Sequence, residues 1–252
     1  MASDNSDSSG NAGKSGKSGK SGDLPRINMR AYAFARLLLR LVFNGYLKTH
    51  VSGTEHLPPP GTATIMAANH SSDLDVFAGG YALNRSGYFL AKIEATRMPL
   101  MGPFLLSVGA IPAKRDQQDS AALRTIMNAL EAGAIVGIAP EGTRSPDGRV
   151  GPYDPGFVWL AARTGAAIVP VAIHGTRALM PKGAKFIKRG HIWVRFGPPI
   201  VLAEADRRPS RERLAEIAAG VRAQTLAMLR DLAEESGIPS PAVTDPGGIE
   251  DV

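Results

Sequence analysis

The segment ANHSSDLDVF, residues 67–76, places His70 three residues before Asp73 and five before Asp75. A neutral imidazole removes a proton from a hydroxyl through Nε2 when a carboxylate accepts the Nδ1 hydrogen. In a regular helix Asp73 would share a face with His70, whereas Asp75 would lie about 140° further around the axis. Asp75 is the partner only if His70 lies in a turn before the helix begins. The segment permits this, because its asparagine and serines favour turns and N-caps; the alternative is a solvated capping turn without chemistry.

A second polar loop, APEGTRS (139–145), directly follows the apolar run AIVGI. Gly142 permits close approach of the backbone to a ligand, and Arg144 offers a planar fork for a phosphate. Glu141 can pair with Arg144 or bond a substrate hydroxyl, and Thr143 adds a hydroxyl between them. The alternative is a surface turn held by a local salt bridge.

In a third segment, GAIPAKRD (109–116), charged residues again follow an apolar run, and Lys114 and Arg115 can face an anion. Its alternative is a solvated strand end. Ligands bind at the carboxyl ends of strands in open α/β sheets. If these runs are neighbouring parallel strands, one edge of the sheet brings together a base and several side chains that can bind a phosphate.

The elements that must position these residues alternate along the chain. Short apolar runs typical of strands lie at 62–69, 88–92, 108–113, 134–140, 166–173 and 191–196. Segments that can form helices lie near 74–84, 97–107, 118–132 and 155–164. This alternation predicts an α/β fold with a mixed, largely parallel sheet flanked by helices. Pro170 is unusual for the interior of a central strand.

The two ends of the chain differ from this middle part. Residues 1–22 are a low-complexity segment rich in Gly, Ser and Lys, for which we expect a disordered tail. Residues 27–48 have the pattern of a basic amphipathic helix, suited either to an anionic membrane surface or to the protein's own core. A closing helix with Ser210 as N-cap leads to a flexible tail at 236–252. Residues 23–235 therefore form the expected single domain.

Composition narrows the classes of function. The formal net charge of +6 favours an anionic partner, but aromatic residues are only 6% and not interleaved with basic ones, so we expect no nucleic acid. With no cysteine and five scattered histidines, we expect no metal site. No uncharged run reaches the roughly 18 residues needed to span a bilayer, which predicts peripheral attachment.

Four segments carry a family resemblance: NHSSDLD, GAIPAKRD, PEGTRS and IVPVAIHG. In this order and at these intervals they resemble the four sequence blocks of the glycerolipid acyltransferase family, over about Val51 to Gly197. Its best-known members are the lysophosphatidate acyltransferases. The resemblance implies transfer of a fatty acyl group from acyl-CoA or an acyl-carrier protein to the free hydroxyl of a lysophospholipid. It implies no cofactor or metal, and a location on the cytoplasmic face of the cell membrane.

The resemblance also assigns roles to residues. Four residues separate histidine and aspartate in the family, which implies His70 as general base and Asp75 as the residue that orients it. Arg115, with Glu141, Gly142, Thr143 and Arg144, would bind the acceptor's phosphate and glycerol. Pro170 would belong to the block on the acyl-donor side.

Two departures from the family pattern concern the third block. Ala139 stands where phenylalanine is frequent, and PYDPGF (152–157) replaces a lysine-rich segment, with Asp154 and Pro155 in place of the lysines. The acceptor is accordingly lysophosphatidate or another lyso-lipid. Two functions of other classes are also compatible: a non-catalytic lipid-binding protein at a membrane surface, and a thioesterase, although the chain has no G-x-S-x-G motif.

Overall fold

The computed structural model describes residues 24–114, 119–184 and 186–242. Its seven strands form one sheet in the order β1-β7-β6-β2-β5-β3-β4. All neighbours pair in parallel except β6 and β7, which are antiparallel. The predicted mixed, largely parallel α/β sheet is therefore confirmed. The strands are β1 (Thr49–Ser52), β2 (Thr64–Ala68), β3 (Tyr88–Lys92), β4 (Ala110–Ala113), β5 (Ile135–Ile138), β6 (Ala167–His174) and β7 (Ile192–Phe196).

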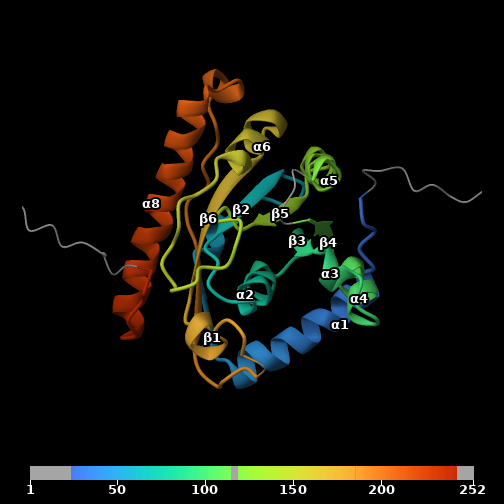
Figure 1. Ribbon diagram of the computed structural model, residues 1–252, viewed down its shortest axis with the longest axis vertical. Helices are drawn as coiled ribbons and strands as arrows, with labels where there is room; N and C mark the ends of the chain where they lie inside the picture. The colour runs from blue at the N-terminus through green and yellow to red at the C-terminus, as the bar shows by residue number, and fades with distance from the viewer. Residues whose placement is uncertain (1–23, 115–118, 185, 243–252) are drawn as a thin grey trace, which may run out of the picture.

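Helices cover both faces of this sheet (Figure 1). The α-helices are α1 (Met29–Arg40), α2 (Leu74–Leu83), α3 (Ile93–Thr96), α4 (Met101–Ser107), α5 (Ser120–Glu131), α6 (Gly156–Thr164), α7 (Thr176–Leu179) and α8 (Arg211–Ser236). Side chains of α5, α6 and α8 form the core on one face, and α2, α7 and the turn after α1 form the core on the other. Two short 3-10 turns, η2 (Thr54–His56) and η3 (Glu204–Arg207), lie between these elements.

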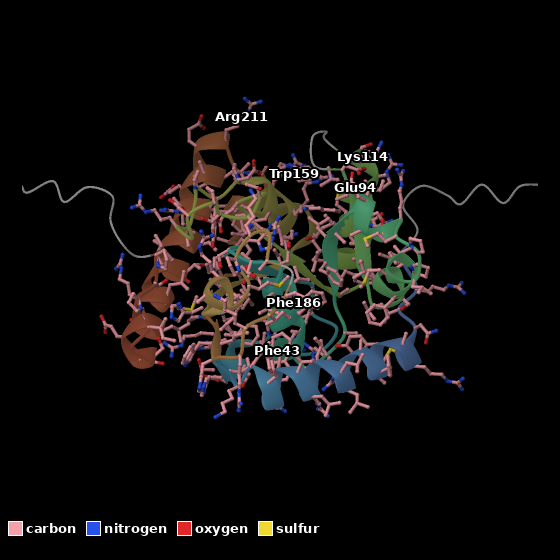
Figure 2. All side chains as sticks on the ribbon, turned by 60° about the horizontal axis from the view of Figure 1, so that its bottom comes forward. Phe43, Glu94, Lys114, Trp159, Phe186 and Arg211 are labelled. Carbon is pink, nitrogen blue, oxygen red and sulfur yellow. The ribbon has the colours of Figure 1, made fainter. Side chains whose placement is uncertain are left out.

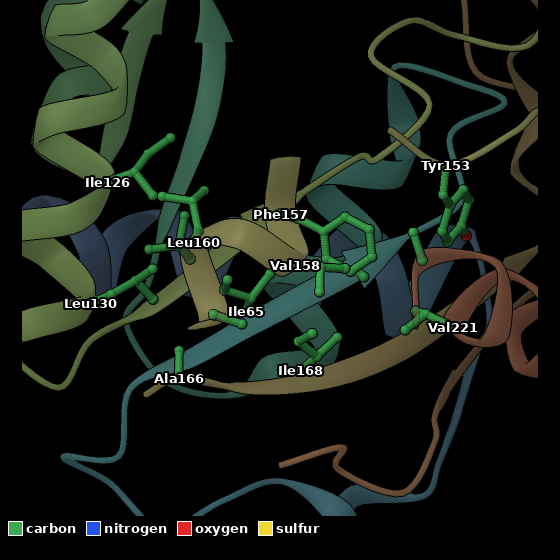
Figure 3. Close-up of a cluster of buried hydrophobic side chains, with 14 of the residues drawn as sticks. Ile65, Ile126, Leu130, Tyr153, Phe157, Val158, Leu160, Ala166, Ile168 and Val221 are labelled. Carbon is green, nitrogen blue, oxygen red and sulfur yellow. The ribbon is translucent and has the colours of Figure 1, made fainter. Parts of the chain in front are cut away.

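Burial on both faces explains the uninterrupted apolar sequence of the central strands. Every residue of β6 is buried, whereas burial alternates along β7, because only a strand covered on both sides has no solvent-facing positions. Figure 3 shows Ile65 of β2 and Ile168 of β6 packed against Phe157 and Val158 of α6. This packing holds the carboxyl ends of the strands in a fixed arrangement.

Pro170 lies inside β6, which has neighbours on both sides. Its carbonyl oxygen accepts a hydrogen bond from Gly197 N, at 2.8 Å, on the side of β7. The nitrogen and carbonyl of a strand residue point to the same side, so the missing N–H costs no bond to β2. The ladder with β7 begins only at Val171. The proline therefore occupies a position where that ladder is already interrupted.

The N-terminal helix is shorter than predicted. Asn28 caps α1 by accepting hydrogen bonds from Arg30 N and Ala31 N, and a π-helical turn, η1 (Leu41–Tyr46), follows α1. The predicted helix over 27–48 is corrected at its end, because Lys48 has a φ of +39° and Thr49 begins β1. Strand β1 was not predicted, since THVS offers too short a pattern.

The outer side of α1 is without a protein partner among the described residues. No residue of α1 is buried, and Figure 2 shows many of its side chains projecting away from the rest of the protein. In η1 only Phe43 is buried, where it stacks on Tyr81 of α2. The exposed large apolar residues of this segment, here called the α1 face, are Met29, Phe34, Leu37, Leu38, Leu41, Val42 and Tyr46.

The closing helix α8 begins at the predicted cap, where Ser210 Oγ accepts a hydrogen bond from Arg213 N. It ends at Ser236, and Gly237 follows with a φ of +66°. Residues 237–242 continue along the molecule, and Ser240 is buried. The predicted tail at 1–22 and most of the tail at 236–252 lie outside the described residues.

Candidate active site

The candidate site begins where β2 ends. The side chain of Asn69 donates to Ile173 O at 3.0 Å and accepts from Ile173 N at 2.8 Å, so it pairs with β6 as a strand residue would. Because the amide is buried and bonded at both ends, the chain beyond it starts from a fixed point. His70 is the next residue, at the carboxyl edge of the sheet.

A turn of residues 70–73 separates β2 from α2. Ser72 Oγ accepts from Leu74 N at 3.2 Å and donates to Met180 O at 2.7 Å. Since α2 begins only at Leu74, His70 is not on the helix. This geometry allows Asp75, in the first turn of α2, to face back toward the imidazole.

The His70 Nδ1 atom lies 3.0 Å from Asp75 Oδ2. A carboxylate only accepts hydrogen bonds, so Nδ1 carries the hydrogen and Nε2 keeps a free lone pair. The His70 side chain is 15% exposed, which leaves that lone pair accessible at the sheet edge. Between the two possible partners in the sequence, the structure selects Asp75.

Asp75 is itself held by several donors. Its Oδ2 also accepts from the backbone N–H groups of Ser71 at 2.7 Å and Ser72 at 2.8 Å. Its Oδ1 accepts from Thr176 Oγ1 at 2.5 Å. The carboxylate is 3% exposed, and a buried charge is stable only when it is hydrogen-bonded in this way. These bonds hold the Asp75 carboxylate in position, and the carboxylate in turn holds the His70 imidazole.

Glu141 braces the same turn from the loop after β5. Its Oε1 accepts from His70 N at 2.8 Å and its Oε2 from Gly151 N at 3.0 Å. Burial raises the pKa of Glu141, and the two backbone donors oppose that rise. The sequence offered pairing with Arg144 or a substrate hydroxyl; the described bonds of Glu141 are instead to the backbone.

The rest of the APEGTRS loop wraps around His70. Ser145 N donates to His70 O at 2.8 Å, and Arg144 Nη1 lies 2.5 Å from Asp73 Oδ2. Gly142 has a φ of +68°, a left-handed conformation that favours glycine in this tight turn. Thr143 is exposed beside it. The structure therefore brings the loop residues predicted at 141–144 together with His70.

Arg115 lies outside the described residues. The residue before it, Lys114, follows β4 and its backbone N–H donates to Asp119 Oδ2 at 3.1 Å. β4 is the edge strand of the sheet, two strands from β5. A role for Arg115 stays a prediction.

Thr176 is a site residue that the sequence did not reveal. It follows the fourth block, is completely buried, and bonds Asp75 from 101 positions further along the chain. Gly175 before it has a φ of +91°, and a Cβ there would lie 2.5 Å from His191 O. The one signal in the sequence was a Gly-Thr pair directly after an apolar strand, and only the adjacency of β2 and β6 gives it meaning.

Residues 48–174 match the sequence profile of the family described as Acyltransferase. The chain belongs to this family. Its match covers the turn with His70 and Asp75 and the loop with Glu141 and Arg144. The predicted resemblance to acyltransferases is thereby confirmed.

Members of the acyltransferase family from several organisms are similar to this chain. A chloroplastic 1-acyl-sn-glycerol-3-phosphate acyltransferase of Brassica napus is 34% identical over 68% of this chain and 51% of its own length. A protein of the same name from Bacillus subtilis (strain 168) is 30% identical over 73% of this chain and 89% of its own length. The chain thus spans about half the length of the plant relative, at 51%.

The fold is also similar to a solved structure of the acyltransferase family. The crystal structure of the 1-acyl-sn-glycerophosphate (LPA) acyltransferase PlsC from Thermotoga maritima matches with a TM-score of 0.64 and 25% identity. The match covers 84% of this chain and 80% of that one.

Proposed function

We propose that this protein transfers a fatty acyl group from an acyl thioester to the free hydroxyl of 1-acylglycerol 3-phosphate, giving phosphatidate. The observation that carries the proposal is the His70–Asp75 pair, with Nδ1 and Oδ2 3.0 Å apart at the carboxyl edge of the sheet. Relatives named 1-acyl-sn-glycerol-3-phosphate acyltransferase support this choice of reaction.

In the proposed reaction His70 Nε2 removes the proton of the acceptor hydroxyl while its oxygen attacks the thioester carbonyl. A tetrahedral intermediate forms, and the carbon–sulfur bond then breaks. The imidazolium returns the proton to the departing sulfur, so the products are an ester and a free thiol. Asp75 stabilises the imidazolium between these steps, because its carboxylate lies against Nδ1. No covalent acyl-enzyme and no cofactor is required.

The acceptor's phosphate and glycerol would be bound by Arg144 and Arg115, with Thr143 offering a hydroxyl and Gly142 allowing close approach to the backbone. Glu141 would act by holding His70 in place through the backbone bond at 2.8 Å. The donor is acyl-CoA or an acyl-carrier protein. Another lyso-lipid acceptor is the second candidate, favoured by Asp154 and Pro155 in place of lysines.

We further propose that the protein acts at an anionic membrane surface on its cytoplasmic face. No helix in the described parts of the chain is long and apolar enough to cross a bilayer. The α1 face supports attachment in the plane of the interface, since exposed apolar residues there lie among arginines.

The test is thiol release from a long-chain acyl-CoA, with and without lysophosphatidate, by wild type and His70→Ala. Loss of a positioned base costs roughly 10²–10⁴-fold in rate, so acceptor-dependent release should fall by that factor while the variant stays folded. His191→Ala, which removes an exposed histidine outside the site, is the control and should retain wild-type rates.

The other outcomes separate the competing functions. Near-wild-type rates in His70→Ala would contradict the proposed base. Thiol release that does not need the acceptor would identify a thioesterase. Binding to vesicles without any thiol release, with acyl-CoA and acyl-carrier-protein donors alike, would identify a non-catalytic lipid-binding protein.

A further inference from the structure

An ion pair joins the two segments that surround His70. Arg144 Nη1 in the loop after β5 lies 2.5 Å from Asp73 Oδ2 in the turn before α2. The Arg144 side chain is 13% exposed, whereas that of Asp73 is 52% exposed. Protein therefore encloses the cation, while its counter-ion faces solvent.

The helix that Asp73 precedes does not use the carboxylate. Asp73 occupies the N-cap position of α2, where an aspartate ordinarily accepts a hydrogen bond from the first turn. Its side chain makes no such bond, and Ser72 Oγ accepts from Leu74 N instead. The bond described for the Asp73 carboxylate is the one to Arg144.

One donor of the Arg144 guanidinium is not satisfied by the described residues. Its Nε is buried, and no described residue accepts a hydrogen bond from it. The next residue, Ser145, donates to His70 O at 2.8 Å, which ties Arg144 closely to the base. A second arginine near this loop, Arg177, is already committed to the carbonyls of Ser145 and Pro146.

We propose that Asp73 sets the headgroup selectivity of the acceptor site by neutralising Arg144. This inference rests on the proposed function and adds a residue that determines specificity. A phosphate that approaches Arg144 also meets the Asp73 carboxylate, and like charges at one site oppose binding. Asp73 thus weakens the preference for lysophosphatidate over lyso-lipids without a phosphomonoester.

Asp73→Asn is the variant that tests this role. Asparagine keeps an oxygen that can accept from Arg144 Nη1, but it removes the charge. If Asp73 only held Arg144 in position, the asparagine would preserve selectivity. If its charge matters, kcat/KM for lysophosphatidate should rise on the order of tenfold relative to kcat/KM for 1-acylglycerol, which lacks the phosphate.

The assay uses acyl-CoA and micelles of a neutral detergent, so that vesicle charge does not enter. The difference between wild type and Asp73→Asn should shrink as salt is added, because exposed charges are screened. Glu204→Gln is the matched control. This variant removes a carboxylate that is 83% exposed in η3. That turn follows Ile200, which pairs with Ile168 near the amino end of β6 and so lies away from the site. Selectivity should not change.

A binding measurement separates this inference from the proposed function. Glycerol 3-phosphate should bind more tightly to Asp73→Asn than to wild type, as measured by calorimetry, and glycerol should not. If wild type acylates no lyso-lipid, the proposed function falls while this binding result still decides the role of Asp73. Unchanged or lowered selectivity, or equal or no binding of glycerol 3-phosphate to the two proteins, overturns the inference.

Discussion

Two aspartates of one turn serve different purposes because of where α2 begins. Asp75, on the helix, is buried and bonds the His70 imidazole, whereas Asp73, just before it, faces solvent and pairs with Arg144. Had the helix started at His70, the assignments would be exchanged, because residues three apart share a helix face. The residue at which α2 starts thus decides which carboxylate bonds the His70 imidazole.

Glu141 links the site to the pH dependence of stability. Burial raises its pKa above the ordinary value of 4.5, so the folded protein holds this proton more tightly than the unfolded chain. The resulting stabilisation is fully present below the unfolded pKa and is lost as the pH rises through the folded pKa. Stability arising from this group therefore falls on going from acid toward neutral pH.

Glu141→Gln removes this titration. A glutamine can accept only one of the two backbone N–H bonds, so we expect a cost of about 1–3 kcal/mol at low pH. The wild type should have the larger free energy of unfolding, and the difference from the variant should become smaller as the pH rises. Urea unfolding of both proteins between acid and neutral pH measures this difference. A gap that widens with pH would mean that the two backbone donors outweigh burial.

At the scale of elements, the α1 face is an apolar surface without a protein partner among the described residues. Leu37 of α1 is 56% exposed and Leu41 of η1 is 63% exposed. Burying a leucine from water is worth about 1.5–3 kcal/mol, so a lipid interface would gain substantially from these side chains. The element therefore contributes little to the core, and the proposed attachment to a membrane surface would depend on it.

Leu37→Glu and Leu41→Glu should each weaken binding to anionic vesicles by about tenfold or more. Each substitution replaces a leucine that would be buried in the lipid of the bound state by a charged residue. The unfolding temperature should change little, since both side chains are already exposed. Sedimentation with vesicles measures the bound fraction. The control is Val201→Glu, which puts the same charge at a 73% exposed apolar residue after β7; equal loss in all three variants would argue against the α1 face.

At the scale of the whole molecule, the formal net charge of +6 favours an anionic surface. Binding to vesicles with acidic lipids should fall steeply between 0.1 and 1 M salt, as the Debye length shrinks from roughly 10 Å to 3 Å. Binding to zwitterionic vesicles should be weaker and change little. Tight binding to zwitterionic vesicles at every salt concentration would show that apolar contact alone holds the protein.

The sequence by itself predicted the elements with strong local signals. Apolar runs located β2 to β7, and apolar spacing with a serine cap located α8. The family blocks singled out His70, Asp75 and the loop at 141–144, because their identities and intervals are local properties. The sequence did not predict β1, because the four residues THVS are too few to show a strand pattern. It also predicted too long a first helix, because nothing in the sequence marks the left-handed conformation of Lys48.

Only the tertiary structure decided how the site is held together. Glu141 supports His70 across 71 positions of sequence, and Thr176 bonds Asp75 across 101. Such contacts depend on the strand order, which places β2 between β5 and β6, and no local pattern encodes that order. The choice of Asp73 for Arg144 has the same origin, because packing of both sheet faces brings the two loops to one edge.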